Sequence, residues 1–439
     1  MTERRQFRAI KGTRDILPPD SARWNWFEHT AREVFESYNF GEIRLPIFEQ
    51  TDLFARSVGT DTDIVSKEMF TFPASQGFEK SAPNGEEQQP VELVSLRPEA
   101  TASVARAYIE HNMQALPGNV KLYYLGPMFR RERPQKGRYR QFYQIGAEVL
   151  GQSDAPAIDA EVLEMLLVFF KRVGLTRTTL YVNSIGDKNC RPQYVEVLRE
   201  ALQKVKDKLG PDSQRRIETN PLRVLDSKVP DEQPVIEKLP RITNHLCDDC
   251  RAHFSRLKDE LTLRGIQFEE NWRLVRGLDY YTRTTFEVIA EGLGSQNAVC
   301  GGGRYDGLVE LLGGPPAKGI GFAIGTDRSI LSIEESGSAP KPDGLSVYVA
   351  WMGIASYPAA VRITRKLRDT GLTVELPPEE MKFKKSLGLA DKLGARYALI
   401  LGEDEVASHT YTLKRLADAD QKKLTEADLL EYLESERRR

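Results

Sequence analysis

The residues best suited to chemistry lie in one stretch, residues 121–151, whose pattern predicts two strands joined by a basic loop. The second strand alternates, as a strand with two different faces does. On the polar face, a glutamine near an aromatic ring is flanked by a carboxylate and by an arginine from the first strand. Such a set would hold a zwitterion or a nucleotide. The alternative is a polar face in water. The apolar or small face carries Tyr143, Ile145, Ala147 and Val149, and the polar face carries Phe142, Gln144, Gly146 and Glu148, to which the same periodicity adds Arg130.

The loop between these strands, residues 130–140, is strongly basic. A basic hairpin tip beside a polar floor indicates contact with a polyanion. A solvated charged loop remains the alternative. Its basic residues are Arg130, Arg131, Arg133, Lys136, Arg138 and Arg140, against the single acidic residue Glu132.

Three other segments carry polar or glycine-rich patterns. Residues 97–101 (RPEAT) place Glu99 and Thr101 at a strand-to-helix junction, where their side chains can face a ligand. The alternative is that this segment is only a helix N-terminus, with Thr101 as the cap. Residues 301–303 are glycines, which let backbone approach a ligand closely or form a bulge or tight turn. Residues 319–325 alternate glycine or alanine with larger residues, which leaves room for a flat ligand. None of these spacings matches the dinucleotide fingerprint or a Walker loop.

A possible metal site lies at residues 245–253, which contain His245, Cys247, Cys250 and His253. A single CxxC with histidines at helical spacing and no second pair is weak support for zinc. The other interpretation is a helical segment with small buried thiols. We therefore expect no structural metal.

Composition limits the classes of function. The chain has 439 residues, enough for two or three domains, and its 40% hydrophobic and 29% charged residues are those of a globular protein. A net charge of −2 confines any nucleic-acid contact to local patches. The chain has no apolar run of membrane-spanning length and no apolar core near its N-terminus. Four cysteines do not suggest a disulfide framework, so we expect a cytoplasmic protein without membrane contact.

The elements suggest two domains. Residues 24–38 predict an amphipathic helix, and 43–48 an edge or interface strand, because Pro46 cannot donate to a ladder. Residues 69–72 and 91–96 predict a hairpin with a long, polar, mobile connection at 73–90. We expect a first domain at 1–333 with a helical insertion at about 187–267, a linker at 334–343, and a small αβ domain at 344–439. Its expected strands are 345–351, 373–376, 397–401 and 410–414, with helices ending at about 369, at 382–393 and at 425–437.

Several segments occur together in a recognisable order: KGTRD from Lys11, residues 43–48 with Pro46, the hairpin of residues 130–148, RGLDYY from Arg276, residues 301–307, and residues 319–328. Together they resemble the histidyl-tRNA synthetases, which are class II aminoacyl-tRNA synthetases, over nearly the full length of the chain. The hairpin, residues 43–48 and residues 319–328 resemble class motifs 2, 1 and 3.

The resemblance implies an α+β fold, with a six- or seven-stranded antiparallel sheet, flanking helices and a helical insertion, and a small C-terminal α/β anticodon-binding domain. It implies a homodimer and a histidine–tRNA ligase. Such an enzyme makes histidyl-adenylate from L-histidine and ATP with Mg²⁺, then transfers the histidine to the 3′ end of tRNA(His).

The resemblance also assigns roles to residues. Arg130, Arg276 and Gln144 would be catalytic, and Arg130, Phe142, Arg276 and Arg328 would bind ATP. Arg133, Gln135 and Arg138 would contact tRNA. Arg276 pairing merely with Asp279 is the competing interpretation. The implied histidine site comprises Glu99, Thr101, Arg130, Gln144, Glu148, Arg276, Tyr280, Tyr281, Gly301, Gly303 and Tyr305.

Three features depart from the family pattern. Ala100 stands where glycine is usual, Thr326-Asp327 stands where leucine-glutamate is usual, and the connection at 73–90 is longer than typical. Two other functions compete: a histidine-binding regulatory paralogue and a synthetase-like sensor of uncharged tRNA in a stress kinase. The first usually lacks the C-terminal domain and the site arginines, and the second needs kinase sequence that this chain does not contain.

Overall fold

The computed structural model describes residues 6–59, 62, 64–74, 92–291, 297–337 and 344–437. The chain forms two compact units, residues 1–340 and 341–439. The expected linker falls partly on helix α10 (Thr326–Glu335), and its residues 338–343 lie outside the described residues, as does most of the expected mobile connection at 73–90. No described helix is both long and apolar enough to cross a membrane.

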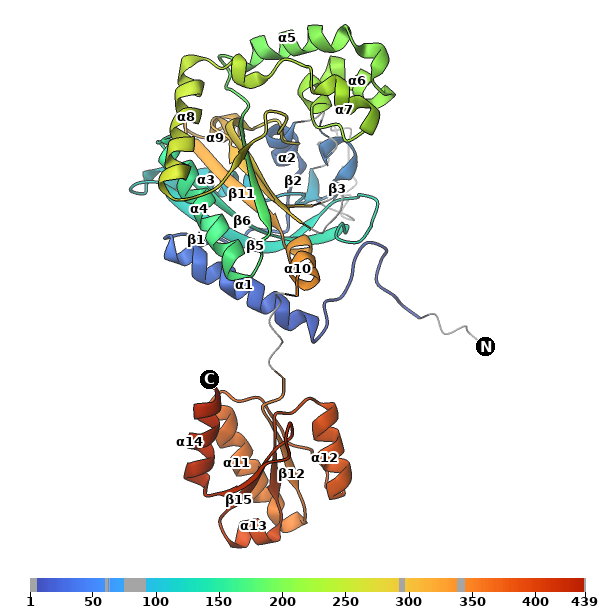
Figure 1. Ribbon diagram of the computed structural model, residues 1–439, viewed down its shortest axis with the longest axis vertical. Helices are drawn as coiled ribbons and strands as arrows, with labels where there is room; N and C mark the ends of the chain where they lie inside the picture. Colours follow the sequence, from blue (N-terminus) through green and yellow to red (C-terminus); the bar gives the residue numbers. More distant parts are fainter. Residues whose placement is uncertain are drawn as a thin grey trace, which may run out of the picture. The chain divides into compact units, whose positions relative to one another are not determined.

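A mixed sheet organises the first unit (Figure 1). Its six central neighbours pair antiparallel, and two-residue strands pair parallel at the two edges, which gives eight strands among the described residues instead of the implied six or seven. The strands, in spatial order, are β1 (Gly41–Glu42), β5 (Val120–Phe129), β6 (Gln141–Gly151), β11 (Lys318–Gly325), β10 (Ala298–Arg304), β9 (Thr282–Ala290), β7 (Thr178–Ser184) and β8 (Glu269–Glu270).

One face of this sheet is covered by helices α1 (Asp20–Ser37), α4 (Pro156–Arg172), α8 (Asp248–Leu263) and α10. Apolar residues at helical spacing on α1, such as Phe27 and Phe35, are fully buried there, as the pattern predicted. Ile145, Ala147 and Val149 of β6 meet them in the same core. The apolar face of β6 is therefore the structural face, and the opposite face is left to other elements.

That opposite face is only partly covered, by α3 (Thr101–Glu110) and α9 (Leu308–Leu311). Beside them lie α2 (Thr51–Val58) and a small antiparallel sheet with the order β2 (Phe48–Gln50), β4 (Leu93–Leu96), β3 (Phe70–Pro73). The β3–β4 pairing confirms the predicted hairpin. The continuous strand expected at 43–48 is wrong: β1 ends at Glu42 and β2 starts at Phe48, with Pro46 in the irregular stretch between them.

The helical insertion connects β7 to the edge strand β8 and has its own apolar core. It contains α5 (Arg191–Gln203), α6 (Pro211–Thr219), α7 (Gln233–Ile236) and finally α8, whose other side packs on α4. Figure 1 shows α5, α6 and α7 gathered as a green layer at one end of the unit. The insertion is thus anchored at its start by β7 and at its end by α8.

The second unit is a small αβ domain built on a sheet with the order β13-β12-β14-β15-β16. The αβ pattern predicted from the sequence is present, and the short helix α13 and strand β16 were not expected. The elements are β12 (Val347–Trp351), α11 (Tyr357–Asp369), β13 (Val374–Glu375), α12 (Phe383–Lys392), β14 (Tyr397–Leu401), α13 (Glu403–Ala407), β15 (Tyr411–Arg415), β16 (Gln421–Leu424) and α14 (Glu426–Arg437).

Candidate active site

A cavity of about 1190 Å³ lies over the uncovered face of the large sheet. Most of the residues singled out from the sequence line it, although they come from segments far apart in the chain. Glu148, Gly303, Tyr305, Arg133 and Gln135 do not line it. The lining contains Glu99, Thr101, Arg130, Arg138, Phe142, Gln144, Arg276, Tyr280, Tyr281, Gly301 and Arg328.

The polar face of β6 forms part of the cavity wall, so the version in which this face lies in water is wrong for Phe142 and Gln144. Gln144 Oε1 is buried and accepts no hydrogen bond from the described residues. A buried carbonyl oxygen without a donor is costly. The Gln144 Oε1 atom is therefore available to accept a hydrogen bond from a ligand.

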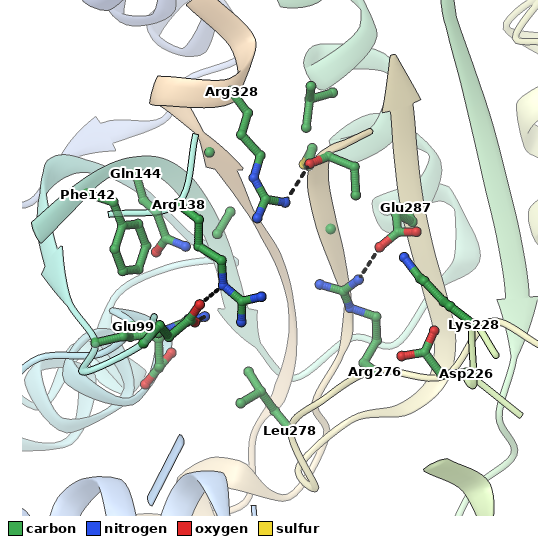
Figure 2. A pocket seen from close by; sticks show the side chains of 18 of the residues that line it. Glu99, Arg138, Phe142, Gln144, Asp226, Lys228, Arg276, Leu278, Glu287 and Arg328 are labelled. Carbon is green, nitrogen blue, oxygen red and sulfur yellow. Dashed lines mark hydrogen bonds and ion pairs between the residues drawn. The ribbon is translucent and has the colours of Figure 1, made fainter. Parts of the chain in front are cut away.

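Five arginines line this cavity, Arg216 of the insertion among them, and Figure 2 shows Arg138, Arg276 and Arg328 pointing into the same space. Arg130 follows the end of β5, donates from Nε to the Pro98 carbonyl at 3.0 Å and lies over the Phe142 ring. Burial, and then the positive charges of Arg138 and Arg130, lower the pKa of Arg328. A bound polyanion would relieve this repulsion between like charges.

Arg276 pairs with Glu287 of β9, at 2.9 Å from NH1 to Oε1, so the alternative in which it pairs with Asp279 is wrong. Its Nε is buried without a hydrogen-bond partner among the described residues. Burial works against the charged form, but Tyr281 and Glu287 outweigh it and raise the pKa of Arg276. The guanidinium is thus held charged, with one donor unused.

Glu99 caps helix α3, a role that the alternative interpretation had given to Thr101. Its carboxylate accepts from the backbone N–H groups of Thr101 (2.7 Å) and Ala102 (3.1 Å). Two such bonds fix the carboxylate against the wall of the cavity. Burial nevertheless raises the pKa of Glu99.

Glu148 lies directly beneath this wall and is 1% exposed. It accepts hydrogen bonds from the hydroxyls of Thr101 (2.8 Å) and Tyr305 (2.7 Å). Burial raises the pKa of Glu148 to about 8, despite those two hydroxyl donors. A ligand can bond to this carboxylate only if the Thr101 or Tyr305 hydroxyl releases its hydrogen bond, or if the ligand and the hydroxyl bond to the same carboxylate oxygen.

Tyrosines surround this carboxylate. Tyr280 and Tyr281 line the cavity with ring centroids 4.7 Å apart, and Tyr280 packs edge-on against Tyr305 at 5.8 Å. Tyr124 of β5 also lines the cavity and was missed from the sequence. The signal for it was available, since Tyr124 pairs with Gly146 of β6 and so shares the face of Glu148.

Glycines of the sheet make space for these side chains. A Cβ at Gly301 would overlap the Arg276 guanidinium, one at Gly321 the Glu148 carboxylate, and one at Gly319 the Tyr305 ring. The space expected for a flat ligand along residues 319–325 is therefore partly filled by the protein's own site residues. Gly303 likewise packs against Tyr281.

The KGTRD segment links two parts of the cavity wall. Arg14 pairs with Asp327 at 2.7 Å, and the second oxygen of Asp327 accepts from the Tyr143 backbone N–H at 3.0 Å. Asp327 thus joins the N-terminal segment, β6 and the start of α10. The helix predicted to begin at Thr326 is confirmed, and it places Arg328 one residue beyond this junction.

The basic loop divides into inner and outer parts. Arg138 faces the cavity and pairs with Glu132, while Arg133 and Gln135 are exposed. Gln135 and Arg138 exchange backbone hydrogen bonds across the tip. Of the three residues assigned to tRNA, two face solvent and Arg138 belongs to the cavity.

One contribution to the cavity wall was not visible in the sequence. The insertion supplies residues 210–213 and 226–229 to this wall, and Figure 2 shows Asp226 and Lys228 beside Arg276.

The structure also rearranges the expected set of zinc candidates. His245 packs against Tyr194, and His253 bonds to the Asp154 carbonyl, away from the two thiols of the CxxC. Asp187 and Cys190 lie beside those thiols instead.

Comparison with known proteins identifies the family of the chain. The histidyl-tRNA synthetase family model matches residues 86–328, and an anticodon binding domain model matches residues 346–436. The chain is 54% identical to a histidine–tRNA ligase of Koribacter versatilis, covering 97% of this chain and 96% of that protein. It is 52% identical to that of Solibacter usitatus, over 98% and 99%.

Among solved structures, the apo histidyl-tRNA synthetase of S. aureus superposes with a TM-score of 0.78 at 35% identity, covering 98% of this chain and all of that one. These matches span both units. The chain therefore belongs to the histidyl-tRNA synthetase family of aminoacyl-tRNA synthetases.

Proposed function

We propose that this chain is a histidine–tRNA ligase that activates L-histidine with ATP and transfers it to the 3′ end of tRNA(His). One observation carries the proposal: Arg130, Arg138, Arg276 and Arg328 meet in the cavity that also contains Glu99, Thr101 and Tyr281. A polyphosphate fits the arginines, and an amino acid with a polar ring fits the remaining groups.

For the first step, the attacking carboxylate and the α-phosphate must be brought in line, and charge must be stabilised as pyrophosphate leaves. Arg130 and Arg276 would bind the α-phosphate and carboxylate, and Arg328 the γ-phosphate, because guanidinium forks bind phosphate oxygens in pairs. Phe142, beside Arg130, would cover the adenine. Gln144 would hold the substrate carboxylate. ATP enters as its Mg²⁺ complex.

For the substrate, neutral imidazole offers one N–H donor and one acceptor nitrogen. Glu148 would accept from the N–H, displacing or sharing the bond from Thr101 or Tyr305, and Tyr281 would donate to the other nitrogen. Glu99, with Thr101, would bind the α-ammonium. Tyr280, Gly301, Gly303 and Tyr305 would shape the pocket. An apolar side chain would leave these buried groups without partners, which explains discrimination against it.

For the second step, the exposed Arg133 and Gln135 would meet the acceptor end of tRNA(His), and Arg138 would act at the boundary with the cavity. The C-terminal unit would bind the anticodon. We place the reaction in the cytoplasm, where translation consumes its product.

We further propose a homodimer through residues 43–48 and the small sheet. Phe48 is 57% exposed there, and Ile47, Phe72 and Leu93 expose further apolar surface. Arg97 binds the carbonyls of Leu45, Pro46 and Pro127, which ties this surface to the hairpin of the cavity. Sedimentation of the chain and of Phe48→Glu tests this: a monomeric parent would contradict it.

Histidine-dependent exchange of pyrophosphate into ATP tests the function. We expect exchange with histidine and none with phenylalanine, and aminoacylation of tRNA(His) that falls more than exchange in Arg133→Ala. A chain that binds histidine without exchange would be the regulatory paralogue. Equal losses of exchange and aminoacylation would remove Arg133 from tRNA contact.

A further inference from the structure

The two ends of the helical insertion bring one carboxylate and three thiols together. Asp187 and Cys190 lie between β7 and α5, and Cys247 and Cys250 lie at the start of α8. One ligand atom from each residue lies within 4.8 Å of every other, although about 60 residues separate the two pairs. The sequence revealed only the CxxC, because its apparent partners were histidines.

This group matches the ligand pattern of a structural zinc site. Each pair has the spacing ligand-x₂-ligand, and the two pairs come from separate segments, as in Cys-rich zinc sites. Tetrahedral Zn²⁺ with thiolates at about 2.3 Å requires ligand atoms about 3.7 Å apart, so a modest contraction of the cluster suffices. Asp187, Cys190 and Cys250 are buried, and three soft thiolates favour zinc over the hard cations.

Burial and the neighbouring thiol and carboxylate groups raise the pKa of Cys250, but other features of the surroundings favour negative charge in the cluster. Cys190 and Cys247 occupy the N-cap positions of α5 and α8, where the helix dipoles stabilise a thiolate. Arg283 lies 3.7 Å from Asp187, and Arg191, next to Cys190, has a buried Nε without an acceptor among the described residues. Three thiolates, a carboxylate and Zn²⁺ sum to −2, which these two guanidinium groups offset in part, since Arg283 also pairs with Asp154 at 2.7 Å.

We propose that Asp187, Cys190, Cys247 and Cys250 bind a Zn²⁺ ion that clamps the base of the helical insertion. On binding, the three thiols release their protons to solvent and three S–Zn bonds and one O–Zn bond form, with no change of oxidation state. The clamp adjoins the active site, because the Gly186 carbonyl accepts from the Arg283 backbone N–H and from Thr282, which follows Tyr281. Zinc therefore holds in place the insertion whose loops line the cavity.

Elemental analysis of the full-length chain, purified under reducing conditions, tests the proposal. We expect about one zinc per chain. Co²⁺ added to the metal-depleted chain should give the near-ultraviolet thiolate-to-cobalt charge-transfer band. Cys190→Ser and Cys250→Ser should each lower metal affinity at least tenfold, while Asp187→Cys should retain the metal.

Matched controls come from the residues outside the cluster. Cys300→Ser and His245→Ala should keep the zinc, since Cys300 lies on β10 and His245 packs on Tyr194. A chain with neither zinc nor a cobalt–thiolate band would overturn the proposal. So would zinc retained in the Cys190→Ser/Cys250→Ser double variant, or zinc lost from His245→Ala as fully as from Cys190→Ser. The cobalt spectrum of the unsubstituted chain stands even where a variant misfolds.

Discussion

Glu148 and Asp159 are both buried carboxylates of the first unit, but their partners differ. Asp159 on α4 is 0% exposed and pairs with the buried Arg304, accepts from Thr284 at 2.7 Å, and lies 3.8 Å from His253. Glu148 is 1% exposed and accepts only from neutral hydroxyls. Among the described residues, no basic group lies within ion-pair distance of Glu148.

The difference separates a structural carboxylate from one kept for a ligand. A buried carboxyl group that lacks a counterion is expensive to ionise, which raises the pKa of Glu148, and the sheet retains this group beneath the cavity. Asp159 instead joins α4 to β10 through Arg304, which Asp306 also binds at 3.0 Å. We expect substitutions at the first residue to affect activity and those at the second to affect folding.

The largest effect should come from Glu148→Ala. A site built to hydrogen-bond a substrate group loses about 10⁴-fold when one partner is missing, so kcat/KM for histidine in pyrophosphate exchange should fall by about that factor. The melting temperature should fall less than that of Asp159→Ala. Glu310→Ala, which removes an exposed carboxylate, is the control. Unchanged exchange in Glu148→Ala would remove Glu148 from the histidine site.

Asp159→Ala should instead destabilise the first unit by about 3–5 kcal/mol, because Arg304 loses its main partner in the interior. Chemical denaturation followed by tryptophan fluorescence measures this. Replacing both partners, as in Asp159→Leu/Arg304→Met, should recover much of the loss. An Asp159→Ala variant as stable as the parent would contradict a structural role for the Asp159–Arg304 pair.

Gly321→Ala tests the space in which Glu148 lies. The added Cβ would overlap the carboxylate, and a displacement of about 1 Å costs on the order of 100-fold. The KM for histidine should rise more than the KM for ATP. Gly41→Ala is a control for added side-chain volume, since nothing lies near its Cβ position and its φ is not positive. Equal changes in both KM values would indicate general damage to the sheet.

The last prediction concerns pH, and its effect is small near pH 5 and grows as pH rises. Because the pKa of Glu148 is raised in the fold to about 8, its protonated form stabilises the fold fully below the pKa of the unfolded chain. That stabilisation is lost as pH rises to about 8, at up to about 1.4 kcal/mol per pH unit. Relative to the parent, Glu148→Gln should therefore gain melting temperature between pH 5 and about 8 and keep a constant difference above. If the melting temperatures of the parent and of Glu148→Gln differ by the same amount at every pH, Glu148 does not titrate between pH 5 and about 8.

Local pattern was sufficient for many elements. The alternation along β6, the β3–β4 hairpin and the helix opened by Thr326 were all predicted, since each depends on neighbours in sequence. Prediction failed at 43–48, where Ile43 and Leu45 pack against a core cluster but Ile47 and Phe48 are exposed, so the segment does not form one strand. The roles assigned to site residues came from family resemblance and remain proposals.

The sequence by itself determined which residue types face each way along a strand or helix, because backbone geometry sets those periods. Only the tertiary structure decided which distant faces meet. It paired Arg276 with Glu287, set Glu148 over Gly321, and brought Cys190 to Cys250. Burial of apolar faces joins segments far apart in the chain, and no local spacing records which segments those are.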